Sequence, residues 1–287
     1  MNKVLYIILI SLFSLTVISC AKKSSDDSKT TTSSPSYAAV GDSGIILTSS
    51  DGSSWTTRTS GTTNTLNGVT YGNSIFVVVG NNGTILTSSG GTTWTARTSN
   101  TTNNLWGVTY GNSIFVVVGN NGTILTSSGG TTWTARTSGT TNRLWRGTYG
   151  NSTFIVVGDN GTILTSSDGT SWTSRTSGTT NGLWEVTYGN STFITVGDNG
   201  TGTGTILTSS DGTTWTSRTS GTTNQLWGVT FGNNTFVVGG DLGTILTSSD
   251  GTTWTSRTSG ISYGLWGITY GNSIFVTVSY GGEILTS

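Results

Sequence analysis

The side chains able to perform acid, base or metal chemistry are scarce in this chain of 287 residues. It contains no His and one Cys, and its twelve Lys and Arg balance its twelve Asp and Glu. Without His, the chain lacks Ser-His-Asp and Cys-His catalysis and His-ligated metal sites. One Cys forms neither an internal disulfide nor a thiolate cluster. Zero net charge argues against nucleic acid as a partner. We therefore expect no metal, no cofactor and no nucleic acid.

Three charged residues depart from an otherwise repeated pattern, and they are the candidate ligand contacts. Arg143 and Arg146 lie on either side of a Leu-Trp pair, and Glu185 follows the equivalent pair of the next repeat. Arg146 and Glu185 therefore occupy equivalent positions and could meet at the centre of a ring of repeats. They could form a structural ion pair, which contributes about 0–1 kcal/mol when exposed. They could instead contact a ligand together with Arg143, because paired charges also mark functional sites.

Most other charged residues recur once per repeat, so they cannot converge on one site. Six arginines share one position of the repeat, where they are expected to form a surface ring or to pair with nearby acids: Arg58, Arg97, Arg136, Arg175, Arg218 and Arg257. Four Gly-Asp-x-Gly loops each supply one carboxylate, from Asp42, Asp159, Asp198 and Asp241. Calcium takes six to eight oxygen ligands. We therefore expect these loops to be solvated turns rather than metal sites.

Residues 1–19 have the form of a lipoprotein signal peptide. Lys3 supplies a positive charge, and residues 4–18 are mostly apolar but too short to span a bilayer comfortably. The segment ends in Val-Ile-Ser-Cys, where Cys20 is the only Cys of the chain. This ending resembles a bacterial lipobox, whose Cys becomes the lipidated first residue of the mature protein. The alternative is a cleaved secretory signal with an incidental Cys.

Residues 20–36 follow the predicted lipidation site and are typical of a flexible tether, because they have no apolar face. Lipidation at Cys20 would hold the protein to a membrane, since each buried CH₂ contributes about 0.8 kcal/mol. Ala21, rather than Asp, follows the Cys, which favours the outer membrane of a bacterial cell envelope.

A period of about 39 residues organises the rest of the chain, residues 37–287. Six Trp residues mark it, at successive spacings of 39, 39, 39, 43 and 39: Trp55, Trp94, Trp133, Trp172, Trp215 and Trp254. The longer spacing comes from extra residues in the Gly-Thr stretch at 200–204. A fixed period of this size indicates a repeat architecture.

Each repeat contains four short segments with the composition of β-strands. In residues 105–143 they are Leu-Trp-Gly-Val-Thr-Tyr, Ile-Phe-Val-Val-Val, Thr-Ile-Leu-Thr-Ser and Trp-Thr-Ala-Arg, separated by Gly and Asn, which favour hairpin turns. The second segment is apolar on both faces, as expected of a strand between two other sheets. Four strands in about 40 residues match a propeller blade. We predict an all-β fold, a β-propeller of four-stranded blades; a β-solenoid is the alternative.

The number of blades follows from counting the segments. The third segment occurs seven times, whereas the first and the fourth each occur six times. We favour seven blades, with an incomplete outer edge in the last and a degenerate first strand at residues 30–32. Six blades, with the terminal segments sharing one blade, is the alternative.

The hairpin between the third and fourth segments carries a recognisable motif. It reads Ser-Ser-Asp-Gly followed by Trp, in four copies: Asp51 with Trp55, Asp168 with Trp172, Asp211 with Trp215, and Asp250 with Trp254. It resembles the Asp-box, or BNR, repeat of sialidase-like and photosystem II stability/assembly factor-like propellers, although Asp and Trp are one residue closer here. Gly90 and Gly129 replace the Asp in two copies, which favours a role for this residue in the turn rather than in chemistry.

The resemblance to sialidases implies an arginine cluster, a Tyr nucleophile with a Glu partner, and an Asp acid/base. The repeat region has two Glu, Glu185 and Glu283, and no carboxylate pair is indicated at the spacing of about 5–5.5 Å that retaining glycosidases need. We therefore expect a monomeric, lipid-anchored and non-catalytic binding or scaffold protein, with an envelope protein or a glycan as ligand. A sialidase-like glycoside hydrolase and an assembly factor for a membrane complex are the alternatives.

Overall fold

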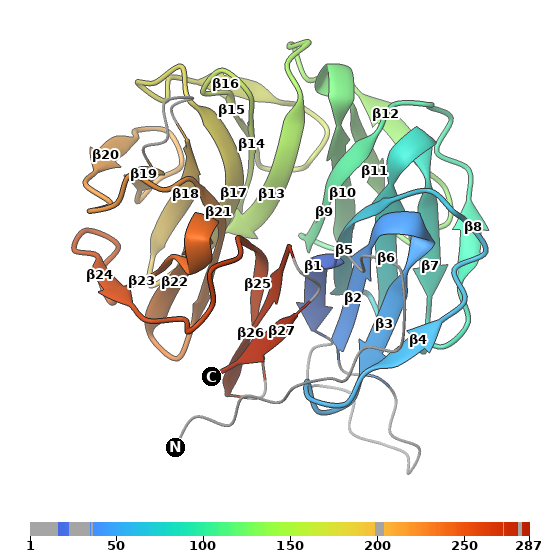
Figure 1. Ribbon diagram of the computed structural model, residues 1–287. Coiled ribbons are helices and arrows are strands. Elements are labelled where there is room, and N and C mark those ends of the chain that lie inside the picture. Colours follow the sequence, from blue (N-terminus) through green and yellow to red (C-terminus); the bar gives the residue numbers. More distant parts are fainter. Residues whose placement is uncertain (1–16, 23–34, 36, 199–203, 272, 281–282) are drawn as a thin grey trace.

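Seven β-sheets stand around a central axis, in the arrangement of a β-propeller (Figure 1). The computed structural model describes residues 17–22, 35, 37–198, 204–271, 273–280 and 283–287, with the backbone alone for 17–22. Six of the described sheets have four strands and the seventh has three. The predicted all-β propeller is therefore confirmed, with seven blades rather than six, and the outer edge of the last described sheet is incomplete.

Each blade is an antiparallel meander whose strands follow one another from the centre to the rim; the blades are numbered in chain order. The innermost strands are β1 (Val17–Lys22), β5 (Leu66–Gly72), β9 (Leu105–Gly111), β13 (Leu144–Gly150), β17 (Gly182–Gly189), β21 (Leu226–Gly232) and β25 (Leu265–Gly271). The second strands are β2 (Tyr37–Gly41), β6 (Ile75–Gly80), β10 (Ile114–Gly119), β14 (Thr153–Gly158), β18 (Thr192–Asp198), β22 (Thr235–Gly240) and β26 (Ile274–Ser279).

The outer half of each blade is made of shorter strands. The third strands are β3 (Ile46–Ser49), β7 (Ile85–Ser88), β11 (Ile124–Ser127), β15 (Ile163–Ser166), β19 (Gly204–Ser209), β23 (Ile245–Ser248) and β27 (Ile284–Thr286). The outermost strands are β4 (Thr56–Arg58), β8 (Thr95–Arg97), β12 (Thr134–Arg136), β16 (Thr173–Arg175), β20 (Thr216–Arg218) and β24 (Thr255–Arg257). Single 3₁₀ turns follow four of the second strands: η1 (Asp42–Gly44), η2 (Asn81–Gly83), η3 (Asn120–Gly122) and η4 (Asp241–Gly243).

The second strand of each blade carries the core, and its two faces pack against different blades. On β10, Phe115 and Val117 pack against Val77 of blade 2, whereas Val116 packs against Phe154 of blade 4. Burying such side chains contributes about 1.5–3 kcal/mol each. The run of consecutive apolar residues is thus explained by burial on both faces, as the sequence predicted.

Six of the seven innermost strands end in Gly, which allows close contact with the neighbouring blade. A Cβ on Gly111 would lie 2.2 Å from Cγ of Tyr149, which belongs to the next blade. The Tyr149 ring in turn packs on Phe154, with 4.6 Å between ring centroids. The Tyr-Gly ending of the first segment therefore lets neighbouring blades meet near the axis.

The ring closes through β1, which is the innermost strand of blade 1. Its backbone pairs with β2 over five positions, from Val17 opposite Gly41 to Lys22 opposite Tyr37, and it contacts β5 of blade 2 and β25 of blade 7. Figure 1 shows these blue and red strands side by side. The sequence had suggested residues 30–32 for this strand; the structure instead uses Val17–Lys22, which continues the apolar segment of residues 4–18. Residues 30–32 lie outside the described residues.

This placement bears on the predicted leader and tether. The expected boundary between residues 19 and 20 falls inside β1, and most of the expected tether, residues 20–36, lies outside the described residues. Among the described residues, no helix has the length and hydropathy that a bilayer crossing requires.

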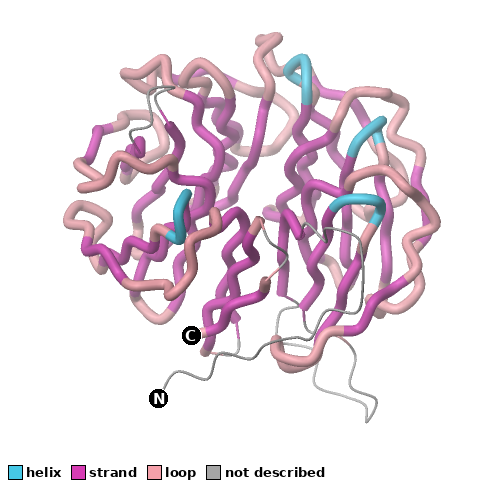
Figure 2. The backbone as a smooth tube through the Cα atoms, in the orientation of Figure 1, coloured by secondary structure: helices cyan, strands magenta, loops and turns pink. Residues whose placement is uncertain are grey.

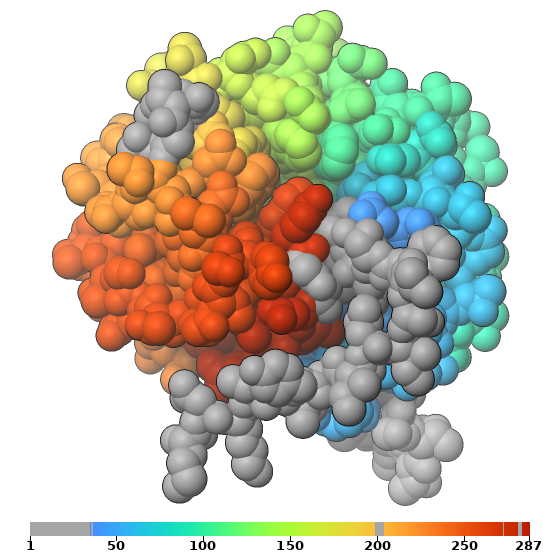
Figure 3. Space-filling view, viewed as in Figure 1, coloured from blue at the N-terminus to red at the C-terminus, as the bar shows by residue number. Residues whose placement is uncertain are grey.

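Two sets of loops form the two ends of the propeller (Figure 2). At one end, here named the linker face, the turn after the second strand meets the linker to the next blade, as in the hydrogen bond from Gly83 N to Asn103 O. At the other end, here named the Asp-box face, the first hairpin meets the Asp-box turn of the next blade, as in the 3.3 Å bond from Asn73 Nδ2 to Ser128 O. In Figure 3 the sequence colours run around the disc.

Candidate functional site

Five half-buried Trp side chains form an arc at the centre of the linker face, and we name them the tryptophan arc. They are Trp106, Trp145, Trp184, Trp227 and Trp266, each the second residue of the repeated Leu-Trp pair. This residue lies at a register shift in the innermost strand, for example between the partners of Val118 and Gly119 in blade 3. Such bulges re-aim side chains. In blade 2 the same position is occupied by Asn67.

The arc consists of two groups of rings. Trp184 stacks on Trp227 with centroids 3.9 Å apart and an interplanar angle of 13°, and Trp227 stacks on Trp266 at 5.1 Å. Trp106 and Trp145 form the other group, tilted at 51° with centroids 4.7 Å apart. The result is an extended aromatic surface rather than a set of isolated rings.

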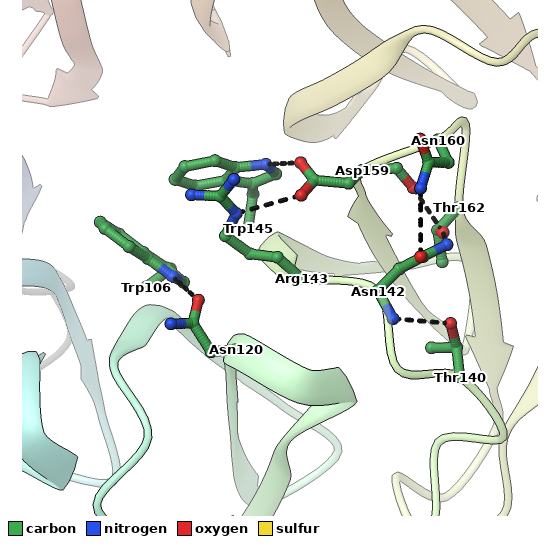
Figure 4. A network of polar contacts seen from close by, with 9 residues as sticks. All are labelled: Trp106, Asn120, Thr140, Asn142, Arg143, Trp145, Asp159, Asn160 and Thr162. Carbon is green, nitrogen blue, oxygen red and sulfur yellow. Dashed lines mark hydrogen bonds and ion pairs between the residues drawn. The ribbon is translucent and has the colours of Figure 1, made fainter.

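Polar residues of the turns after the second strands hold three of the five rings in place. The indole N–H groups of Trp106 and Trp145 donate to Asn120 Oδ1 and Asp159 Oδ1, both at 2.7 Å (Figure 4). Trp227 donates to Asp241 Oδ1 at the same distance. The buried ends of these indoles are satisfied, so the orientations of their rings are fixed before any ligand arrives.

Arg143 lies over the group formed by Trp106 and Trp145. Its Nε donates to Asp159 Oδ2 at 3.1 Å, and its side chain is 40% exposed. Its guanidinium carbon is 4.2 Å from the centroid of Trp145 and 5.9 Å from that of Trp106. Figure 4 shows Asp159 joining this guanidinium to the indole of Trp145. Arg143 is thus a partly exposed cation held by a carboxylate and an aromatic face.

Arg146 and Glu185 meet between the innermost strands. Arg146 Nε is 3.5 Å from Glu185 Oε2, and the side chains are 19% and 24% exposed. The same guanidinium donates to the carbonyl oxygens of Asn67 at 3.0 Å, Trp145 at 3.1 Å and Trp106. One side chain thereby joins blades 2, 3, 4 and 5.

Most other blades carry Gly at this position, for a steric reason. A Cβ on Gly107 would lie 2.6 Å from the carbonyl oxygen of Trp145 in the next blade. In blades 4 and 5 the polar side chains of Arg146 and Glu185 occupy the space between the strands instead. The structure therefore brings these two residues together, but it does not bring Arg143 into their contact.

Burial changes the titration of this pair. It raises the pKa of Glu185 to about 7, against the opposing effect of the Arg146 charge. Burial also lowers the pKa of Arg146, and Glu185 partly offsets this. Desolvation disfavours the charged forms of both residues. The ion pair therefore stabilises the folded state less than its distance of 3.5 Å alone would suggest.

The four Asp-box aspartates lie on the opposite face and organise their own turns. Asp168 Oδ1 accepts the backbone N–H groups of Thr170 at 2.8 Å and Ser171 at 3.1 Å, and Trp172 donates its indole N–H to Gly169 O. Hydrogen bonds from Thr170, first from its hydroxyl and then from its amide, hold the pKa of Asp168 well below its usual value. Asp51, Asp211 and Asp250 make equivalent bonds.

The two copies that lack Asp keep the same turn. The Ser of the motif still accepts the Gly amide at 2.8 Å, from Gly91 to Ser88 Oγ and from Gly130 to Ser127 Oγ. Gly91 and Gly130 have φ of 71° and 73°, close to 73° at Gly169. The Asp side chain therefore supports the turn without being needed to form it.

The six repeated arginines, here named the rim arginines, end the outermost strands at the linker face. Each donates from Nε to a Thr hydroxyl of the third strand at 2.8–2.9 Å. Ion pairs within the described residues involve Arg143 and Arg146, so no carboxylate there pairs with a rim arginine. Of the two arrangements expected from the sequence, a surface ring or pairing with nearby acids, the rim arginines form the surface ring.

The described residues contain no group of three or more Asp, Glu, Cys or His side chains that could hold a metal ion. Two of the turn aspartates, Asp159 and Asp241, bind indoles instead. The indole–turn pairs could not be identified from the sequence, because the arc depends on a bulge that periodicity does not reveal. The Trp of each Leu-Trp pair was the available signal.

Comparisons with known proteins establish the fold. No family model and no curated protein matches the chain. It resembles YCF48 from Cyanidioschyzon merolae, with a TM-score of 0.72 and 16% identity over 95% of both chains. It also resembles YCF48 bound to D1 peptide, with a TM-score of 0.74 and 16% identity over 95% of this chain and 91% of the other. A catalytically inactive virginiamycin B lyase from Staphylococcus aureus with quinupristin gives a TM-score of 0.80 and 13% identity over 95% and 94%. These neighbours are β-propellers.

Proposed function

We propose that the protein is a non-catalytic binding protein that holds a peptide segment of a partner protein against the tryptophan arc. The observation that carries this proposal is the arc itself, five half-buried indoles gathered at one end of the ring. Three of their N–H groups are bonded inside the protein, so a ligand meets mainly aromatic surface. Trp and Arg dominate the binding energy of protein interfaces.

Arg143 supplies the polar contact of this surface. Its Nε is held by Asp159, which leaves the terminal nitrogens of a 40% exposed side chain to donate to a peptide carbonyl or carboxylate. Arg146, by contrast, directs its donors to three backbone carbonyls and Glu185. We assign Arg143 to ligand contact and the Arg146–Glu185 pair to support of the ring. The neighbour YCF48 with bound D1 peptide supports the capacity of this fold for a peptide.

The test is capture of a partner by the full chain. Crosslinking and co-purification from bacterial envelopes are compared for the wild type, the Trp106→Ala/Trp145→Ala double variant and Arg143→Gln. Loss of two anchoring rings should weaken capture about tenfold or more. Tyr263→Ala is the matched control, because Tyr263 is an aromatic residue that is 51% exposed and lies outside the arc. Undiminished capture by folded arc variants would rule out the arc as the binding surface.

Glycoside hydrolysis is the second candidate, and the raised pKa of Glu185 is the observation that favours it, because general acids titrate near neutrality. Fluorogenic glycosides, sialosides included, provide the assay. Turnover that disappears in Glu185→Gln would establish a hydrolase. Turnover that persists would remove Glu185 from the mechanism, and no turnover on any substrate is expected if the protein only binds.

We further propose that Cys20 carries a lipid that anchors the protein in the bacterial envelope, at the outer membrane, where it acts as a scaffold or as an assembly factor for a membrane complex. Mass spectrometry of the mature N-terminus tests the lipid. Cys20→Ser should abolish the acyl mass and release the protein from the membrane fraction. An unmodified Cys20 in membrane-extracted protein would contradict the anchor.

Cleavage before Cys20 has a structural consequence, because Val17 and Ser19 pair with β2 inside β1. The mature protein would keep the pairs of Cys20, Ala21 and Lys22 only. The same mass spectrum therefore shows whether the innermost strand of blade 1 is retained whole or shortened by processing.

A further inference from the structure

The rim arginines are ordered cations without an acidic partner among the described residues. Arg175 lies opposite Ile163, the first residue of β15, and donates from Nε to Thr165 at 2.9 Å. The other five make the equivalent bond. No further hydrogen bond from these side chains occurs within the described part of the chain. Each guanidinium is therefore anchored at Nε, with its two terminal nitrogens able to donate to a ligand.

The two ends of the propeller carry different sets of charged residues, and the linker face also holds the turn carboxylates Asp42, Asp159, Asp198 and Asp241. The rim arginines lie at the linker face, where the third strand begins. The Asp-box aspartates lie at the opposite face, where hydrogen bonds of their own turns stabilise their charge. Residues 37–287 contain no Lys. The positive charge of the rim is thus confined to one arginine per blade, repeated over six blades.

A polar groove lies beside four of these arginines. The grooves whose linings include Arg136, Arg175, Arg218 and Arg257 have volumes of about 1070, 770, 590 and 410 Å³. Ser, Thr, Asn and Gly residues, from two successive linkers and the turn between them, make up most of each lining. Hydroxyl, amide and backbone groups here can both donate and accept hydrogen bonds.

We propose that the rim of the linker face binds a linear anionic polysaccharide. Carboxylate or sulfate groups of the polymer would pair with successive rim arginines, because a guanidinium can bind such groups with two parallel hydrogen bonds. The sugar hydroxyls would bind in the Ser/Thr/Asn grooves between them. One cation per blade gives weak single sites, and a polymer that reaches several blades gains affinity by avidity.

The same observations disfavour nucleic acid as the polymer. Nucleic acid binding depends on dense Lys and Arg contacts to closely spaced phosphates, whereas this chain has a net charge of zero and isolated arginines. The proposal is independent of the peptide site, since no rim arginine belongs to the tryptophan arc.

Binding of the full chain to defined polymers tests the proposal. The probes are polygalacturonate for carboxylates, heparin for sulfates, dextran as a neutral polysaccharide, and double-stranded DNA. We expect an anionic polysaccharide to bind, with an affinity that falls as salt rises and rises with polymer length, and dextran to bind weakly. The proposal would be overturned if dextran bound as tightly as both anionic polysaccharides do. It would also be overturned if DNA bound more tightly than these polysaccharides at physiological salt.

Variants locate the site. Replacing Arg136, Arg175 and Arg218 by Gln should weaken binding about two- to fivefold per residue, and therefore about tenfold or more in the triple variant. The triple Lys variant keeps the charge and should recover part of the loss. The matched control is a triple Gln variant of Thr132, Ser171 and Thr214, because these exposed residues lie in turns of the opposite, Asp-box face. Unchanged binding by a folded triple Gln variant would overturn the proposal. If that variant does not fold, the dependence of wild-type binding on salt and on polymer length tests the proposal instead.

Discussion

Arg146 shows how one residue can serve a whole ring. Its guanidinium contacts carbonyl oxygens of three innermost strands and the carboxylate of a fourth, at a position where most repeats have Gly. The sequence indicated that Arg146 and Glu185 would occupy equivalent places, and the structure shows the contact. The three carbonyl contacts could not be foreseen, because they depend on how closely the strands converge.

Replacing Arg146 by Gly should therefore lower the free energy of unfolding by about 2–4 kcal/mol, since it leaves a partly buried carboxylate and three carbonyls without this donor. Chemical denaturation with urea measures the change. The Arg146→Gly/Glu185→Gly double variant should recover part of the loss, because it restores the residue found in most other blades. A double variant less stable than the single one would contradict this account.

Glu185 predicts a pH dependence of stability. Its pKa rises from an ordinary value near 4.5 to about 7 in the folded protein. Between these values the folded state holds a proton that the unfolded state has released, so the free energy of unfolding should decrease as pH rises from about 5 to 7. The slope for one proton is at most about 1.4 kcal/mol per pH unit.

Urea unfolding at several pH values measures this slope, with Glu185→Gln as the control that should flatten it. An identical slope in the wild type and the variant would show that other groups cause the dependence.

At the scale of the element, the Asp-box turn offers its own internal comparison. Blades 2 and 3 carry Gly90 and Gly129 where other blades carry Asp. A Cβ at Gly90 would have only Thr92 Oγ1 nearby, at 3.8 Å, so there is room for a side chain. The replacement residue would find the same amide donors that Asp168 uses.

We expect Gly90→Asp and Gly129→Asp to raise the melting temperature, because each restricts the unfolded chain, an effect of roughly 0.5 kcal/mol, and adds acceptors for turn amides. Since these bonds lower the pKa of the native Asp-box residues, the gain should be present above the ordinary Asp pKa and disappear as pH falls through the lowered value. Scanning calorimetry at neutral and acid pH checks both. Gly91→Asp is the contrasting control, because Gly91 has φ of 71° and a Cβ there would lie 3.3 Å from the Phe76 ring, so it should destabilise.

The strands were predictable where the same sequence pattern recurs in several repeats. The apolar run of residues 114–118 indicated burial on both faces, and β10 confirms it. Two features were not predictable. The strand that opens blade 1 shares no clear pattern with its six equivalents, and the position of the tryptophan arc depends on a bulge, whose extra residue breaks the two-residue alternation on which sequence arguments rest.

At the scale of the molecule, the ring depends on the contacts that β1 makes with blades 2 and 7. A chain that begins at residue 23 loses the innermost strand of blade 1 and leaves β2 with an unpaired edge. We expect its melting temperature to fall by about 5 °C or more, relative to a chain that begins at residue 17 and keeps the strand. Equal melting temperatures would show that another segment fills this place.

The stacked indoles also give the protein an optical property. Trp184 and Trp227 lie 3.9 Å apart and nearly parallel, so their electronic transitions couple and contribute jointly to the near-ultraviolet circular dichroism. A molecule that arrives at the arc and changes their spacing would change that signal. The centre of the linker face therefore contains its own label-free spectroscopic reporter, which Trp184→Phe should weaken, because the stack of Trp227 on Trp266 remains.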